Sequence, residues 1–88
     1  MSSKPVIRKG DSTSHGGTVI EGIDSYPVFD KAIACKGHMV VCPLCKGTFP
    51  IAEGVSTVTI EGKNPAVDGM KTACGASLIA SQAEYKIE

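Results

Sequence analysis

The stretch that decides the fold is Val19–Cys42, which reads VIEGIDSYPVFDKAIACKGHMVVC and recurs at Ile51–Cys74 as IAEGVSTVTIEGKNPAVDGMKTAC. The two copies align without a gap, and apolar positions such as Val28 and Ile60 correspond. The identical pairs are Glu21/Glu53, Gly22/Gly54, Lys31/Lys63, Ala34/Ala66, Gly37/Gly69 and Cys42/Cys74. Such self-similarity indicates copies of one supersecondary unit that bury a common core.

A shorter copy precedes these two at Lys4–His15 and aligns with Lys31–Cys42. The identical pairs are Lys4/Lys31, Lys9/Lys36 and Gly10/Gly37. The three copies end in His15, Cys42 and Cys74, and each of these side chains can bind a metal. We therefore expect a single domain over residues 1–88, with repeat units at about 4–15, 19–42 and 51–74 and a C-terminal tail at 83–88.

The local pattern of each unit is that of β-structure. Val, Ile and Thr are abundant and Leu is rare, which favours strands because branched β-carbons pack well on a pleated surface. The run Val55–Ile60 leads into Glu61-Gly62, a two-residue hairpin signal, and Pro27 suggests an edge strand in the corresponding run. The sequence predicts an all-β fold of about three hairpin units, with at most a helical turn near residues 80–83.

The Cys42-Pro-Leu-Cys45 knuckle lies in the one loop where the threefold pattern is broken by an insertion. Two thiolates at this spacing can bind one ion because the intervening turn folds back. Together with the other unit ends they make a Cys3His set: His15, Cys42, Cys45 and Cys74. Four filled positions are typical of structural zinc, and a domain this small needs such a staple.

Two further residues of the same chemical types are set apart from this site. His38 corresponds to Asp11 and Met70 in the other units, which share no ligand chemistry, so a turn or surface role is favoured. Cys35 is interpreted as a small buried hydrophobe. His15 by itself, before two glycines, would be an ordinary turn residue, and only the repeat correspondence favours it as a ligand.

Composition limits the possible partners and the compartment. Lys plus Arg and Asp plus Glu are 9 each, so no basic footprint for nucleic acid is present. The chain has no Trp, two Phe and two Tyr, so aromatics for base stacking are scarce. The start, MSSKPVIRK, resembles no signal peptide, and no apolar run is long enough to span a membrane. Synthesis in a reducing cytoplasm favours metal binding over disulfides, although two disulfides stay possible after export.

The ordered motifs resemble the PAAR (proline-alanine-alanine-arginine) repeat family over nearly the whole chain, from Pro5 to about Ser81. The motifs are Gly10-Asp11 with Thr13-Ser-His-Gly-Gly17, Cys42-Pro-x-Cys45, and Asp68-Gly69 with Thr72-x-Cys-Gly-Ala76 and Leu78-Ile79. The namesake tetrapeptide is degenerate: Pro5-Val-Ile-Arg8 keeps its ends, whereas Ala32–Cys35 and Pro65–Asp68 keep less. This tetrapeptide is variable in the family, so the departure weakens the name more than the assignment.

The resemblance implies a small cone in which three β-hairpin units surround a pseudo-threefold axis and one zinc ion pins the strands near the apex. Family ligands fall on His15, Cys42, Cys45 and Cys74, and His38 stands where many members have Asp. The implied function is the non-enzymatic tip of the bacterial type VI secretion spike. Such a tip is monomeric on its own and is seated, one per trimer, on the β-helix of the valine-glycine-repeat spike protein (VgrG).

The resemblance further implies synthesis in the bacterial cytoplasm and export by type VI secretion, without a signal peptide, to the extracellular space or a target cell. Transient contact with the target membrane and non-covalent carriage of effectors are expected. Two alternatives remain at this point: a small zinc module that binds nucleic acid or protein, and an oxidoreductase that uses Cys42 and Cys45. Hydrolytic zinc chemistry is disfavoured because the site has no open position and no general base nearby.

Overall fold

The computed structural model describes residues 4–87, and within that range the chain forms strands, turns and bends but no helix, so the predicted all-β class is confirmed. Residues 80–83 contain no helical turn. The strands are β1 (Lys4–Pro5), β2 (Ser12–Thr13), β3 (Thr18–Val19), β4 (Ile23–Val28), β5 (Lys31–Ile33), β6 (Met39–Cys42), β7 (Gly47–Pro50), β8 (Leu78–Ile79) and β9 (Lys86–Ile87).

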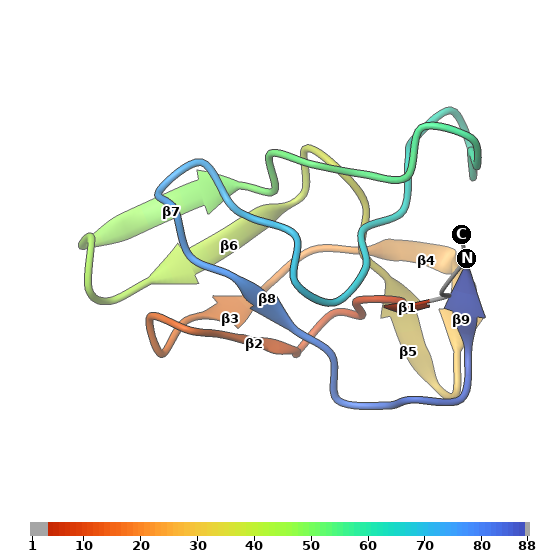
Figure 1. Ribbon diagram of the computed structural model, residues 1–88, viewed down its shortest axis with the longest axis horizontal. Helices are drawn as coiled ribbons and strands as arrows, with labels where there is room; N and C mark the ends of the chain where they lie inside the picture. Colours follow the sequence, from red (N-terminus) through yellow and green to blue (C-terminus); the bar gives the residue numbers. More distant parts are fainter. Residues whose placement is uncertain (1–3, 88) are drawn as a thin grey trace.

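One end of the molecule is a closed ring of hairpins. The largest sheet has the strand order β7-β6-β3-β2-β8. Two isolated bridges, Ile51↔Thr72 and Lys71↔Ser77, connect its outer strands, β7 and β8, through a further hairpin at residues 71–77. Figure 1 shows the β2–β3 and β6–β7 hairpins together at the left, with β8 beside them. Because the ring closes on itself, residues 4–87 leave no free sheet edge at this end.

The other end, at the right of Figure 1, consists of three short hairpins, which we call the base hairpins. β4 pairs with β5 through a turn in which Phe29 and Asp30 have positive φ. The second base hairpin turns at Glu61 and Gly62, also with positive φ, beside the Ile60↔Lys63 bridge. The third is counted with them for its equivalent position. It is the antiparallel pair of β1 and β9, which come from the two ends of the chain, so no turn joins them.

Hydrogen bonds between the units follow a cyclic order. The backbone N–H of Ile7 donates to the carbonyl of Ala66 (2.9 Å), that of Ala66 to Ala34 (3.0 Å), and that of Ala34 back to Ile7 (2.8 Å). The turns at Gly10, Gly37 and Gly69 repeat the same left-handed conformation, with φ of 96°, 95° and 90°. This cycle of equivalent contacts confirms the predicted pseudo-threefold arrangement, consistent with a cone.

Two apolar clusters fill the interior, one under each end. The cluster inside the ring comprises Ile7, Val19, Ala34, Val40, Ile51, Ala66 and Leu78. The cluster above the base hairpins, which we call the base cluster, comprises Val6, Ile23, Val28, Ile33, Cys35, Val55 and Val67. Cys35 is fully buried in the second cluster, and burial raises the pKa of its thiol to about 11, with a smaller opposing effect of Lys63. The interpretation of Cys35 as a small buried hydrophobe is confirmed.

The segment after β8 is tied to the rest of the fold by a partly buried polar network. The guanidinium of Arg8 donates to Ser81 Oγ (2.6 Å), which in turn donates to Asp11 Oδ1 (2.5 Å). Arg8 also donates to the carbonyls of Val28 and Phe29, at 3.1 and 3.2 Å. Sequence analysis did not single out Ser81, because its partners lie at the other end of the chain.

Removing the residues after Ser81 should destabilise the fold without removing the metal site. β9 covers β1, the Val6 N–H donates to the Tyr85 carbonyl (3.0 Å), and Tyr85 and Ile87 pack against the base cluster. A chain ending at Ser81 is expected to lose about 3 kcal/mol of stability, from the apolar area that it exposes. Thermal unfolding measures this loss. An unchanged melting temperature, or loss of metal binding, would contradict the prediction.

Candidate metal centre

His15 and Cys74 are carried by two copies of the same turn. In each copy a threonine hydroxyl oxygen accepts a backbone N–H four residues ahead: Thr13 Oγ1 from Gly17 (3.0 Å) and Thr72 Oγ1 from Ala76 (3.2 Å). The residue after each candidate ligand is a glycine with positive φ, 76° at Gly16 and 89° at Gly75. A side chain is rarely tolerated in that conformation, so the glycine is what lets the turn reverse directly behind the ligand.

Cys42 and Cys45 come from the β6–β7 hairpin, at the end of β6 and in the β6–β7 turn. The backbone N–H of Cys45 points at Cys42 Sγ (3.4 Å), as the fold-back of a C-x-x-C knuckle requires. Lys46 closes the turn with a φ of 59°. Cys42 is buried and Cys45 is exposed. The knuckle therefore presents one sulfur from the protein interior and one from the surface.

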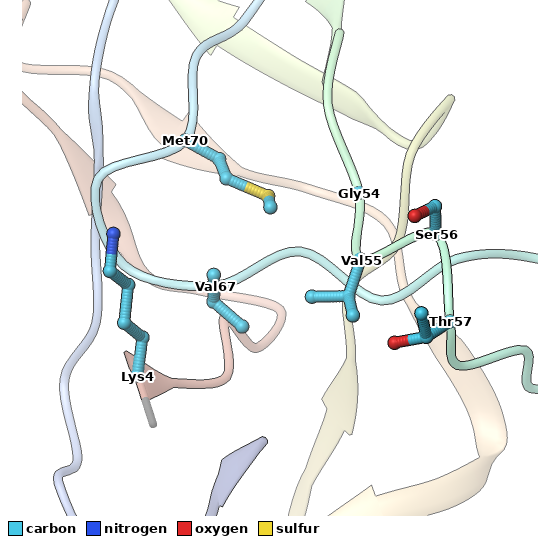
Figure 2. A pocket seen from close by; sticks show the side chains of 7 residues that line it. All are labelled: Lys4, Gly54, Val55, Ser56, Thr57, Val67 and Met70. Carbon is cyan, nitrogen blue, oxygen red and sulfur yellow. The ribbon is translucent and has the colours of Figure 1, made fainter. Parts of the chain in front are cut away.

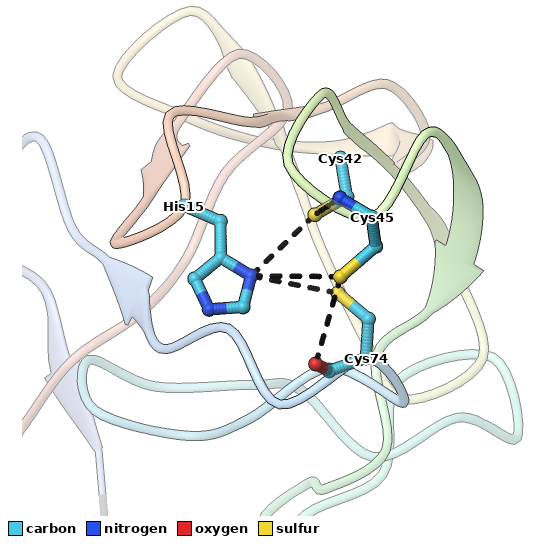
Figure 3. Close-up of side chains that lie close together, drawn as sticks. All are labelled: His15, Cys42, Cys45 and Cys74. Carbon is cyan, nitrogen blue, oxygen red and sulfur yellow. Dashed lines mark hydrogen bonds between the residues drawn. The ribbon is translucent and has the colours of Figure 1, made fainter.

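The four side chains converge, as Figure 3 shows, with Nδ1 of His15 directed toward the three sulfurs. All four candidate ligand atoms lie within 4.8 Å of one another. His15 Nδ1 is 3.5 Å from Sγ of Cys42, 3.9 Å from Sγ of Cys45 and 4.0 Å from Sγ of Cys74. A tetrahedral zinc site has edges of about 3.6 Å between nitrogen and sulfur. The residues therefore fit one structural zinc ion, as predicted.

The electrostatics of the cluster point to a cation as well. The hydroxyl of Thr72 lies 3.1 Å from Cys74 Sγ and, as the main cause, lowers the pKa of that thiol to about 6. Cys45 shifts the other way, to a pKa of about 11, chiefly through its hydrogen bond with Cys42. Three thiols this close cannot all ionise without a compensating positive charge. Zinc supplies that charge when it is bound.

His38 lies outside this cluster and serves a turn, one of the two roles predicted for it. Its Nδ1 accepts the backbone N–H of Cys35 (2.9 Å), just as Asp11 Oδ2 accepts that of Arg8 (2.8 Å) in the preceding unit. Burial lowers the pKa of His38, with smaller effects from nearby charges. The ring nitrogen therefore replaces a carboxylate oxygen at the equivalent position of the repeat.

A solvent-open cavity of about 250 Å³ lies between β1 and the segment after β7 (Figure 2). Its lining combines small, apolar and hydroxyl side chains with one charged side chain: Lys4, Gly54, Val55, Ser56, Thr57, Val67 and Met70. The described lining contains no pair of acid and base side chains, so it has no constellation typical of hydrolysis. Thr13 and Thr72 are the residues of the centre that sequence analysis did not assign a role. Their signal was the Thr repeated two residues before His15 and two residues before Cys74.

Comparison with known proteins gives one finding that covers most of the chain. A protein-family model described as PAAR motif matches residues 9–80, a range that contains the closed ring and all four clustered side chains. No curated protein matches the chain.

Proposed function

The chain belongs to the PAAR-motif family, the tips of type VI secretion spikes, and on this premise we propose that it caps the blunt end of a trimeric VgrG-type spike. Membership of the family indicates a role associated with the type VI spike. The specific proposal is that one chain caps one spike trimer. The observation that supports it most directly is the repeated pattern of apolar residues on the base hairpins.

Each base hairpin contributes two apolar side chains, two residues apart, at equivalent positions of its outer segment. The first set is Tyr26, Val58 and Tyr85, and the second is Val28, Ile60 and Ile87. Val28 is buried within the base cluster, and the other five pack against it and remain partly exposed. We call these six residues the base set. A partner made of three identical chains can offer one matching surface to each hairpin, so a threefold spike end suits this pattern.

Open strand edges support the same partner. Within the described residues β4 pairs only with β5, and β9 only with β1, so the outer strands keep a free side. A spike made of β-helix could continue its strand stacking along these sides. Pro27 lies in β4 with no N–H to offer, which agrees with the edge position predicted for it.

The opposite end is suited to mechanical work rather than to catalysis. We take His15, Cys42, Cys45 and Cys74 as ligands of one zinc ion that ties the three hairpin turns together. Binding of structural zinc is worth about 10–16 kcal/mol, comparable with the whole stability of a small domain. With four protein ligands the ion keeps no open position for a substrate, so we assign the protein no enzymatic activity.

The route of the protein follows from the same proposal. It is made in the bacterial cytoplasm and leaves with the spike, which brings it into brief contact with a target membrane. Effectors would travel with it non-covalently. No helix of residues 4–87 is long and apolar enough to cross a bilayer.

A charge placed in the base set should strongly weaken spike binding. Ile60→Asp would bury a carboxylate against the spike end, and we expect an affinity loss of about 100-fold, since an unpaired buried charge is costly. Ile79→Asp is the matched control, because Ile79 is 45% exposed on β8, away from the base hairpins. Binding is measured by co-purification and titration with a spike trimer.

The expected stoichiometry is one chain per spike trimer. A ratio of one chain per spike chain, or equal loss of affinity in both aspartate variants, would contradict capping through the base.

A further inference from the structure

Two tyrosines of the base set touch each other across two repeat units. The hydroxyls of Tyr26, in β4, and Tyr85, just before β9, lie 2.8 Å apart. The third equivalent position is Val58, which carries no polar atom. The base therefore holds one phenol pair within an otherwise apolar set, and this pair breaks the threefold pattern at a single place.

The pair has one more hydrogen to donate than it uses. Two phenols carry two O–H groups, and in an O–H···O contact one hydroxyl donates while the other accepts. The hydrogen of the accepting phenol must then go elsewhere. Within the described residues the hydroxyls form no hydrogen bond except the one to each other, so water takes this hydrogen in the free protein. The contact also raises the pKa of Tyr85, which keeps its phenol protonated.

Docking on a spike would remove that water. A buried donor left without a partner weakens binding, so a tightly bound spike end must offer an acceptor at this place. The inference rests on the proposed capping. It adds the chemistry that the partner surface must have.

We propose that the Tyr26–Tyr85 pair is the polar anchor of the base, and that it donates to a neutral acceptor, a main-chain carbonyl, on the end of the spike trimer. The acceptor must be neutral because the spike presents it three times. Where it faces Val58 it finds no donor. A carbonyl that already accepts one hydrogen bond tolerates a spare lone pair, whereas a buried carboxylate without a partner does not.

The test compares the affinities of three variants for a spike trimer that binds the wild-type chain. In Y26F/Y85F both hydroxyls are lost and both rings stay. The free protein should melt within about 2 °C of wild type, because replacing both partners of a hydrogen bond by apolar groups is nearly neutral. Affinity for the spike should fall about tenfold, since the hydrogen bond from the pair to the carbonyl is lost.

The single variants Y26F and Y85F distinguish a hydrogen-bonding role of the pair from simple packing of the two rings. Each leaves one phenol that still donates to the spike, so each should lose less than about threefold in affinity, and the double variant should exceed the sum of the two.

Wild-type affinity in the double variant would overturn the anchor while leaving the capping intact. Failure of the wild-type chain to bind any spike trimer would overturn both. Full loss in each single variant would also contradict the anchor, because one remaining donor should then be enough.

Discussion

Replacing Cys74 by alanine is expected to release the zinc ion and to lower the melting temperature by about 20 °C or more. Cys74 Sγ lies 4.0 Å from His15 Nδ1 and comes from a different hairpin than the other two sulfurs. Removing it leaves three ligands and frees one of the three turns. Because structural zinc contributes about 10–16 kcal/mol, even a partial loss shifts the melting temperature of so small a domain by tens of degrees.

Elemental analysis and thermal unfolding, each with and without a chelator, measure the two effects. His15→Ala should behave as Cys74→Ala does, and chelation should lower the wild-type melting temperature to a similar value. Cys35→Ala is the control, since it also removes one thiol, but from the base cluster. It should keep one zinc per chain and cost only about 1 kcal/mol. Full zinc occupancy in both ligand variants would show that the ligand set is wrong.

Gly17→Ala is expected to cost about 3 kcal/mol or more, although it adds a single methyl group. A Cβ at this position would come 2.1 Å from the carbonyl oxygen of Val41 and 3.0 Å from Thr13 Oγ1. The Val41 oxygen belongs to the backbone of β6, so it can move away only if β6 separates from β3. That contact lies directly behind His15 and Cys42, so zinc affinity should fall together with stability.

Gly16→Ala is the matched control, one residue away in the same turn. Gly16 has a φ of 76°, but nothing lies within 4 Å of its added Cβ. Its cost is therefore only that of the left-handed conformation, about 1–2 kcal/mol. Thermal unfolding of the two variants compares steric overlap with backbone strain. A Gly17→Ala protein that melts at or above the temperature of Gly16→Ala would contradict the assignment.

Much of this fold could be read from periodic residues. The glycines at 10, 37 and 69 align in the repeat, and all three adopt the same left-handed turn conformation. The unit ends His15, Cys42 and Cys74 predicted one shared metal site, and the inserted knuckle added Cys45 to it. Such inferences succeed because a turn conformation or a ligand type depends on the residue types close by in the sequence. A repeat places these residue types at equivalent positions three times.

Positions where the copies differ were harder to interpret. Gly17 corresponds to Ala76 in the third unit, so the repeat alone suggests that alanine is tolerated there. Only the approach of the Val41 carbonyl distinguishes the two sites. Tyr85 was likewise assigned to a tail, and its contact with Tyr26 depends on strands from both ends of the chain.

The sequence by itself determined the class of fold, the number of units and the chemistry of the metal site, because each depends on residue type at regular spacing. Tertiary structure alone decided how the set of units closes. β9 supplies the outer strand that the first unit lacks, and Ser81 joins Arg8 to Asp11. The physical reason is that closure depends on pairing between distant segments, whose partners meet only once every unit has packed around the common core.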